Sequence, residues 1–471
     1  MDCHLKKILR LLFPFIFVFL LYSIRIFIPV VSIDTENFIN SSSDIIYSWY
    51  SIGRFSLGLY INFFKLIPLN IYFNNIVSLV LYFIAVYILV CDFDRDSNDY
   101  KKRIIMFLLI LTSPLLAEQY AFTLQNVEVA ISYLLLVIVM KALFKVIYNK
   151  RYLYLLVTPL LILVFGTYQS FYMMYITLAI IYYLDNYDDK KKFKDQLKII
   201  LSYVLVLVIY SILTIVSGNI INSILDVEAT GYLTSQMNWF NGNFVKGILY
   251  CGYYVVSVLF GLGIDNNLGY LVLIIIVLIN LKKEGCKRSF IYNLALIMLL
   301  FSPFLISVLF GTITFSRAQF SIPIIMAYLY GREISKKYIK IIACCLVLVQ
   351  SIGTIYLFDI DLERYNNDVK LLDYVEKIEN EKNLPIIFIG NVSYERDFTG
   401  EVLGKSFYNW DYKSERLSND RVFSFMKSQG FKYEVATTEQ IKEVINEADK
   451  YLELVNYTDK YIVVNLDKYS K

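Results

Sequence analysis

Apolar runs of about 20 residues recur along the chain from residue 9 to residue 357. A helix of that length spans the hydrocarbon core of a bilayer, which is about 30 Å thick. Hydrophobic residues make up 57% of the 471 residues and charged residues only 18%, which excludes a water-soluble globular protein. The alternating segments of about ten residues that form a membrane barrel are absent. The sequence therefore predicts an all-α polytopic membrane protein.

Positive charges set the expected orientation of the spans. Lys6 and Lys7 precede the first span, residues 9–31, and later basic loops end at Arg103 and Arg151. Because cytoplasmic loops are enriched in Lys and Arg, we expect the N-terminus in the cytoplasm and the next polar interval on the outer face. The net charge of +4 needs no nucleic-acid partner, since the basic residues lie in short loops between spans. The apolar runs and this charge bias together predict about eleven transmembrane helices.

Two segments depart from a simple alternation of spans. Residues 152–184 are too long for one crossing and are interrupted at residues 166–170, which predicts two shorter spans with an outer turn between them. If residues 244–263 crossed, the basic loop 282–288 would lie outside, against the usual charge bias. We therefore expect a re-entrant or interfacial segment there, with residues 268–281 as the crossing.

The C-terminal residues change in character, because they are charged and contain no long apolar run. Short buried strands are predicted at residues 385–390 and 461–466, and helices at 366–381, at 420–429 and after Thr437. Thr437 and Gln440 have the spacing of a capping box. With a last outward span at residues 341–358, the sequence predicts a membrane domain, 1–358, and a small extracytoplasmic α/β domain, 359–471.

Cysteine and histidine usage limits the possible chemistry. The six cysteines contain no CxxC pair, so neither a disulfide framework nor a cysteine-bound metal is expected. The only histidine, His4, lies in the N-terminal tail, which excludes Ser-His-Asp triads and histidine metal sites. Any chemistry must use carboxylates, arginine, tyrosine or amides, and we expect no cofactor.

The first polar interval, residues 32–58, concentrates carboxylates directly after the first span. Asp34 and Glu36 follow the end of that span closely, which fixes them near the bilayer surface. A carboxylate within hydrogen-bond reach of a sugar hydroxyl can take its proton while the oxygen attacks an anomeric carbon. Asp44 in the same interval is a candidate for substrate contact. The alternative is a solvated acidic loop without a catalytic role.

Three arginines are candidates for binding a lipid phosphate. Arg54 and Arg317 lie in expected outer intervals, where positive charge is depleted, and a guanidinium can clamp a phosphate bidentately. Arg25 lies inside the first span, and an intramembrane arginine is a functional candidate by default. The alternative for each is that it snorkels to lipid head groups.

Aromatic and amide side chains near the outer turns are candidates for binding sugar. Tyr168 and Gln169 place a stacking ring beside an amide at the break within residues 152–184. Trp49 offers a second ring, and Glu118 lies at the next outer turn. The alternative for the aromatic residues is the belt of Trp and Tyr at the membrane interface.

Several of these motifs occur in a fixed order along the chain. They are Asp34-Thr35-Glu36, Ser48-Trp49, Gly53-Arg54-Phe55, Gly166-Thr167-Tyr168-Gln169-Ser170, Arg317, and the segment at residues 384–390. In this order and spacing the chain resembles the bacterial polytopic glucosyl transferases of the GtrII type, which modify O-antigen and related surface polysaccharides. The resemblance covers nearly the whole chain.

The resemblance implies a GT-C-like enzyme of the bacterial cytoplasmic membrane. Such an enzyme transfers a sugar, here glucose, from undecaprenyl phosphate to O-antigen, teichoic acid or capsule on the outer face. An acidic residue of the first outer loop is the expected base, which maps onto Asp34 or Glu36. The paired aspartates of the family motif are replaced here by Asp-Thr-Glu, so either carboxylate remains a candidate.

Other functions place different demands on the sequence. A polysaccharide flippase predicts charges at the middle of the membrane and repeated helix pairs, whereas here the charges gather at the outer surface and no repeat is visible. A glycan polymerase is chemically close to a transferase and is not separated from it by the sequence. A sensor would need a cytoplasmic output module, and the inner loops are short. The expected partners are therefore a polyprenyl-phosphate sugar, a polysaccharide acceptor and the lipid bilayer.

Overall fold

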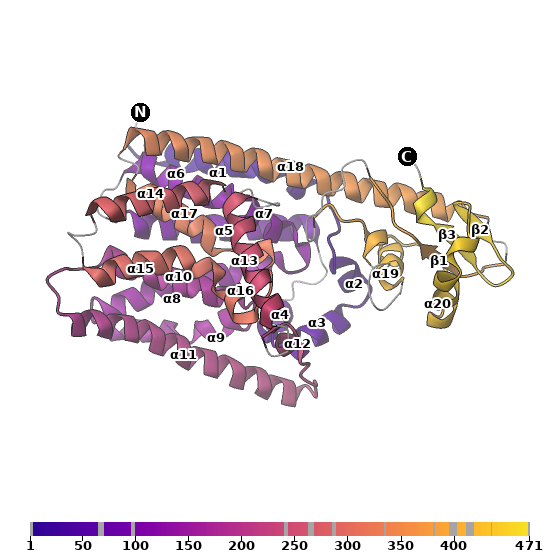
Figure 1. The fold of residues 1–471 in the computed structure, drawn as a ribbon, viewed down its shortest axis with the longest axis horizontal. Helices are drawn as coiled ribbons and strands as arrows, with labels where there is room; N and C mark the ends of the chain where they lie inside the picture. The colour runs from indigo at the N-terminus through magenta and orange to yellow at the C-terminus, as the bar shows by residue number, and fades with distance from the viewer. Residues whose placement is uncertain are drawn as a thin grey trace. The chain divides into compact units, whose positions relative to one another are not determined.

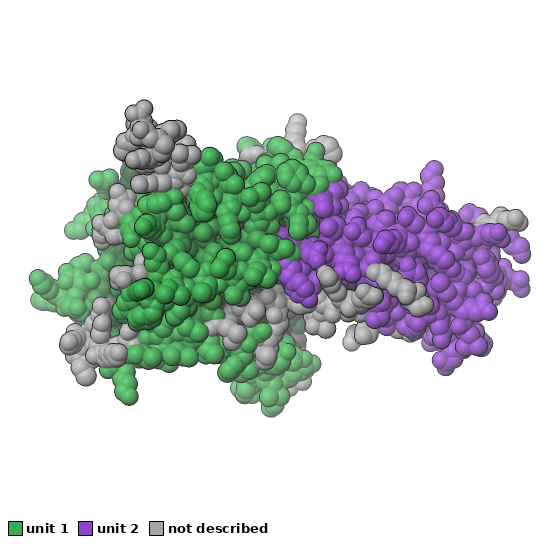
Figure 2. Space-filling view, turned by 90° about the horizontal axis from the view of Figure 1, so that it is seen from above, with its two compact units in different colours: residues 1–27, 46–120, 125–355 green, residues 28–45, 121–124, 356–471 purple. Residues whose placement is uncertain are grey.

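The computed structural model describes residues 3–64, 70–95, 99–239, 244–261, 268–284, 289–333, 336–379, 382–394, 403–410, 419–434 and 436–469. The chain divides into two compact units, coloured separately in Figure 2. Unit 1 consists of residues 1–27, 46–120 and 125–355, and unit 2 of residues 28–45, 121–124 and 356–471. Each unit is described by itself.

Unit 1 is built almost entirely from helices (Figure 1). Its first half contains α1 (Cys3–Phe27), α4 (Phe55–Phe64), α5 (Ile71–Phe93), α6 (Tyr100–Leu111), α7 (Pro114–Ala121), α8 (Asn126–Ile147), η2 (Tyr152–Val157), α9 (Leu160–Phe165) and α10 (Ser170–Asp185). Its second half contains α11 (Phe193–Ile224), α12 (Tyr232–Ser235), α13 (Phe244–Phe260), α14 (Leu268–Glu284), α15 (Phe290–Phe301), η3 (Ser302–Phe304), α16 (Leu305–Phe310), η4 (Ser316–Ala318) and α17 (Ser321–Glu333). Helices α8, α10 and α15 lie side by side, with α10 in contact with both of the others.

Several helices have the length and composition of membrane spans. Among the described residues, five candidate spans are long and apolar enough: α5, Thr123–Ile147, α11, Phe290–Phe310 and Lys337–Glu376. The pair α6 and α7, bent by 51°, makes a sixth if it is counted as one span. Helix α11 exposes Leu205, Ile212 and Ile215, as expected of a helix that faces lipid. The protein is thus a helical membrane protein, and the count of about eleven spans stays a prediction.

The break expected within residues 152–184 is present. Helix α9 ends at Phe165 and α10 begins at Ser170. The backbone N–H of Ser56 donates to the carbonyl of Gly166 at 3.1 Å. A Cβ atom at Gly166 would lie 2.5 Å from the Phe55 ring, so only glycine allows this close approach. The predicted interruption is therefore confirmed, and it is a packing site for the start of α4.

Polar side chains inside unit 1 bond to one another. Asn75 of α5 donates to the carbonyl of Arg25 at 2.6 Å and accepts from the amide of Asn126 at 2.8 Å. The hydroxyl of Tyr120 donates to the carbonyl of Asn75 at 2.7 Å. All four residues are buried, and such bonds hold helices together where water is excluded. This network joins α1, α5, α7 and α8.

Unit 2 contains a small mixed sheet with helices beside it. Strands β1 (Ile386–Ile389) and β3 (Ile462–Asn465) are parallel, and β2 (Val455–Tyr457) pairs antiparallel with β3, which gives the order β1-β3-β2. Helices α19 (Asp420–Ser428) and α20 (Thr438–Asn446) belong to the same unit (Figure 1). Both predicted strands and the Thr437–Gln440 capping box are confirmed. The sequence did not predict β2.

Two sequence expectations about element boundaries were wrong. The expected last span, 341–358, and the expected helix 366–381 are parts of one helix, α18 (Lys337–Glu376), because no glycine or proline interrupts the polar residues between them. The first polar interval, expected as a loop, contains α2 (Thr35–Asn40) and α3 (Ser42–Ser51). The assignment of domains to residues 1–358 and 359–471 stays a prediction.

The polar part of α18 is stabilised by a buried ion cluster within unit 2. Arg364 contacts the carboxylate of Asp361 at 2.7 Å and that of Asp368 at 3.3 Å. Asp368 also accepts from the hydroxyls of Tyr394 and Ser406 at 2.8 and 2.6 Å. The charged side chains are at most 4% exposed, so their pairing is required to offset the cost of burial.

Candidate active site

The segment that enters α2 is folded by short-range polar contacts. The hydroxyls of Ser32 and Thr35 lie 2.9 Å apart, and the N–H of Thr35 donates to the carbonyl of Ser32 at 3.1 Å. The N–H of Thr123 donates to the Ser32 hydroxyl at 3.1 Å. Asp34 caps α2 with φ 66°, in the left-handed region that few residues other than glycine adopt. Strain of this kind is concentrated at functional sites.

Two carboxylates of this segment converge on one guanidinium nitrogen. Nη1 of Arg421 lies 2.6 Å from Oδ1 of Asp34 and 2.7 Å from Oε1 of Glu36. The three side chains differ in exposure: Glu36 is fully buried, Arg421 is 27% exposed and Asp34 is 34% exposed. The cluster is therefore open to solvent on the Asp34 side and closed on the Glu36 side.

Glu36 is held in an unusual electrostatic state. Burial raises the pKa of its carboxyl group to about 7, and the adjoining Arg421 opposes this shift without overcoming it. Its second oxygen, Oε2, is buried and has no hydrogen-bond partner among the residues that the structure describes. A carboxylate with an unsatisfied oxygen is costly to bury, which is typical of a group retained for function.

Helix α19 places Arg421 against this segment. The helix begins at Asp420, so Arg421 lies in its first turn, and α19 packs against α2. The side-chain amide of Asn40 donates to the carbonyl of Ser424 at 2.7 Å, which fixes one helix against the other. A cation in the first turn opposes the helix dipole, so its carboxylate partners offset a local cost.

The buried cluster of α18 holds the same segment from its other side. Nη2 of Arg364 donates to the carbonyl of Val31 at 3.2 Å, three residues before Asp34. The segment that carries both carboxylates is thus bonded at Val31 and Ser32 before it reaches Asp34. This arrangement gives the exposed carboxylate a fixed position.

A second group of candidates meets within unit 1. The guanidinium of Arg54 lies over the Tyr168 ring, 4.8 Å from its centroid, a distance typical of a cation–π contact. The Tyr168 ring also contacts Phe320, with 6.5 Å between centroids. Phe320 follows closely after Arg317, whose guanidinium lies 5.0 Å from the Phe315 ring. Two predicted site residues that are distant in sequence, Arg54 and Tyr168, are therefore in contact, and Phe320 of a third segment packs against the same ring.

The remaining predicted residues have less specific surroundings. Trp49 is buried and its carbonyl accepts from the N–H of Arg54 at 2.8 Å, so it supports that turn. Asp44 is exposed in the first turn of α3, and Gln169 is partly buried just before α10. Glu118 and Arg25 are both 1% exposed and Tyr168 is 5% exposed, so all three are buried in unit 1. The roles of these residues in binding substrate stay predictions.

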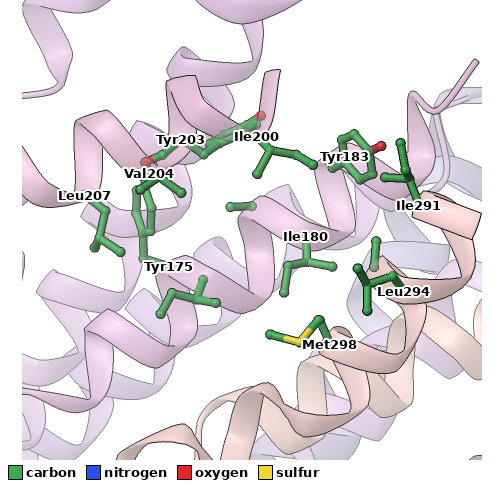
Figure 3. Close-up of a pocket in the computed structure, with 13 residues that line it drawn as sticks. Tyr175, Ile180, Tyr183, Ile200, Tyr203, Val204, Leu207, Ile291, Leu294 and Met298 are labelled. Atoms are coloured by element: carbon green, nitrogen blue, oxygen red, sulfur yellow. The ribbon is translucent and has the colours of Figure 1, made fainter. Parts of the chain in front are cut away.

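A cavity of about 280 Å³ lies in another part of unit 1 (Figure 3). It is formed between α10, α11 and α15, and its lining is aliphatic except for tyrosine and methionine side chains. It contains none of the predicted site residues and no charged group. Because it lacks a carboxylate and a cation, we do not assign the active centre to this cavity.

A family comparison identifies what kind of protein carries these clusters. A model of the family described as glucosyl transferase GtrII matches residues 23–330. The chain belongs to the glucosyl transferase GtrII family. The resemblance to this family is therefore confirmed over residues 23–330, whereas the segment at residues 384–390 lies outside the match, and the family implies glycosyltransferase activity. Comparisons with curated proteins and with solved structures found no match.

Sequence reasoning missed one member of the carboxylate cluster of this GtrII protein. Arg421 lies outside the matched residues and 385 positions from Glu36 along the chain. One signal was available: an arginine in the first turn of a predicted helix, where acidic residues are preferred, indicates an anionic partner. Among the described residues, no cluster of three or more His, Cys, Asp or Glu residues forms a metal site.

Proposed function

We propose that this GtrII protein transfers glucose from a polyprenyl-phosphate donor to a surface polysaccharide on the outer face of the membrane, with Asp34 as the general base. The observation that carries the proposal is the pair of carboxylates on Arg421, of which one is exposed and one is buried. Glycosyl transfer needs a base for the acceptor hydroxyl, and this chain has no histidine beyond His4 to supply one.

The different exposure of the two carboxylates supports different roles for Asp34 and Glu36. Asp34 is 34% exposed, so a sugar hydroxyl can approach its carboxylate. Glu36 is fully buried, and its pKa of about 7 means that it holds a proton for part of the time at neutral pH. In this assignment Glu36 supports the site, and Asp34 meets the acceptor.

The proposed reaction conserves atoms and charge. The acceptor hydroxyl oxygen forms a bond to C1 of the donor sugar, and Asp34 takes the hydroxyl proton. The bond between C1 and the phosphate oxygen breaks, and the polyprenyl phosphate leaves with the electron pair. Because a phosphate is a good leaving group, no general acid is required.

Arg54 is assigned to the donor phosphate and Tyr168 to a sugar ring. The support for this assignment is their contact within unit 1 at 4.8 Å, since arginine stacks on aromatic rings and its planar guanidinium matches the geometry of a phosphate. Arg317 is the second cationic candidate of the same group, beside Phe315.

Label transfer with purified protein tests the proposal. Radiolabelled undecaprenyl-phosphate glucose is mixed with an envelope glycan extract, and label in polymer is counted. Asp34→Asn should lower the rate by about 100- to 10,000-fold, the range for loss of a general base. Glu36→Gln should retain more activity than Asp34→Asn.

A matched variant controls for loss of a negative charge elsewhere in unit 2. Glu439 is exposed at the start of α20, so Glu439→Gln should transfer at the rate of the unaltered protein. Full activity in the Asp34→Asn/Glu36→Gln double variant contradicts the assignment of the base. No transfer by the unaltered protein from any polyprenyl-phosphate sugar contradicts the proposed reaction.

A further inference from the structure

The carboxylate site is completed by a residue from beyond the part of the chain that the family model matches. Arg421 comes from α19, whereas the matched residues end at 330. Asp34, Glu36 and Arg421 all belong to unit 2. The contact therefore raises the question of what a guanidinium does between two carboxylates, one of which is the proposed base.

The net charge of the cluster argues against a role for Arg421 in binding the donor phosphate. With Glu36 ionised the three groups carry a net charge of −1, and with Glu36 protonated a net charge of 0, so in neither state does the cluster attract the phosphate of the donor. The nitrogen that faces both carboxylates is within 2.7 Å of each of them. We therefore ascribe the effect of Arg421 to its contacts with Asp34 and Glu36.

The contacts of Arg421 indicate instead that it orients the carboxylate of Asp34. A single nitrogen, Nη1, fixes the distance between Oδ1 of Asp34 and Oε1 of Glu36 by contacting both. The opposite side of the segment is bonded at Ser32 and Val31. The backbone of Asp34 has a left-handed conformation, which surrounding contacts must stabilise. The guanidinium thus holds a strained residue with its carboxylate oriented toward solvent.

We propose that Arg421 is a positioning residue, which orients the Asp34 carboxylate for proton transfer while Glu36 anchors the guanidinium. This inference rests on the proposed function and adds to it that α19 is part of the catalytic apparatus. Residues after 330 therefore supply an element of the active site that the family match does not cover.

Kinetics of Arg421→Gln test the inference. The change removes the charge and one shared contact, and misplacement of a reacting group by about 1 Å costs about 100-fold in rate. We expect kcat to fall by about that factor while KM for undecaprenyl-phosphate glucose stays within about twofold, since phosphate is bound elsewhere. The kcat of Arg421→Lys should lie between those of the unaltered protein and Arg421→Gln, because an ammonium keeps the charge but not the planar geometry.

The pH profile separates positioning from simple destabilisation. Arg421 opposes the raised pKa of Glu36, so in Arg421→Gln the Glu36 carboxyl should hold its proton more tightly, and the part of the profile that depends on Glu36 should move to higher pH. The charged groups that face Glu36 are Asp34 and Arg421. Lys427→Gln, an exposed change in the same helix, should leave both rate and profile unchanged.

A second variant keeps the test decisive if Arg421→Gln does not fold. Removing Arg421 alone leaves Glu36 buried without its cation, so the double variant Arg421→Gln/Glu36→Gln removes that charge as well. We expect it to fold and still to lose about 100-fold in kcat. An unchanged kcat and pH profile in a folded Arg421 variant overturns the inference, provided that the unaltered protein transfers label. Absence of transfer by the unaltered protein overturns the proposed function instead.

Discussion

In two clusters among the described residues of unit 2, one arginine contacts two carboxylates: Arg364 with Asp361 and Asp368, and Arg421 with Asp34 and Glu36. Around Arg364, both carboxylates are at most 1% exposed, and hydroxyl and backbone donors complete their bonding. Around Arg421, Asp34 is 34% exposed and Glu36 has a partnerless oxygen among the described residues. The chemical groups alone do not distinguish a structural cluster from a reactive one. The two clusters differ in the solvent exposure of a carboxylate and in whether every carboxylate oxygen has a hydrogen-bond partner.

The Arg364 cluster should give the largest change in stability. Arg364→Gln leaves Asp361 and Asp368 buried without their cation, which costs about 3–5 kcal/mol of the free energy of unfolding. Thermal unfolding of the purified protein in detergent measures this. Asp361→Asn/Arg364→Met/Asp368→Asn removes all three charges and should recover most of the loss.

The comparison fails if Arg364→Gln is as stable as the unaltered protein. It also fails if that variant lowers kcat without lowering the unfolding temperature, because the sealed cluster would then act on the chemistry. Arg421→Gln is the matched change at the open cluster, and we expect a smaller loss of stability there because Arg421 is 27% exposed.

Glu36 should make the stability of the protein depend on pH, and burial also raises the pKa of Asp368 in the Arg364 cluster, so both clusters contribute in the same direction. The pKa of Glu36 is raised to about 7 in the folded protein from 4.5, so the folded state binds the proton more tightly than the unfolded state. Stability should therefore fall as pH rises from about 4.5 to about 7, by up to about 3 kcal/mol at 1.36 kcal/mol per pH unit, and change no further above that range.

Glu36→Gln isolates this effect, because the amide does not titrate. Unfolding temperatures measured across that pH range should slope downward for the unaltered protein and lose that component of the slope in Glu36→Gln. An identical slope in the two proteins would assign the pH dependence to other groups, such as Asp368 of the Arg364 cluster.

The sequence predicted the parts of this fold that depend on local patterns. Apolar runs gave the spans, and the Thr437–Gln440 spacing gave the start of α20. It did not reveal that α18 continues through its polar end, because the ion pairs of Arg364 that stabilise this region are buried only in the folded chain. Hydropathy treats such charged residues as the end of a span.

The candidate site shows the same limit. Asp34 and Glu36 are evident from their position after the first span, whereas Arg421 joins them from 385 residues beyond Glu36. Arg54 and Tyr168 were each selected as separate motifs, but their contact depends on the close approach of Ser56 to Gly166. Pairings between distant segments are set by tertiary packing, which one sequence without homologues does not specify.

A third arginine extends the comparison and should give the smallest effect. Arg54 lies over the Tyr168 ring, with its guanidinium 4.8 Å from the ring centroid. If it binds the donor phosphate, Arg54→Gln should raise KM for undecaprenyl-phosphate glucose by about tenfold, equivalent to about 1.4 kcal/mol, with little change in kcat. Tyr168→Phe retains the ring and should leave KM close to its original value. An unchanged KM in Arg54→Gln would contradict the assignment of Arg54 to the donor phosphate.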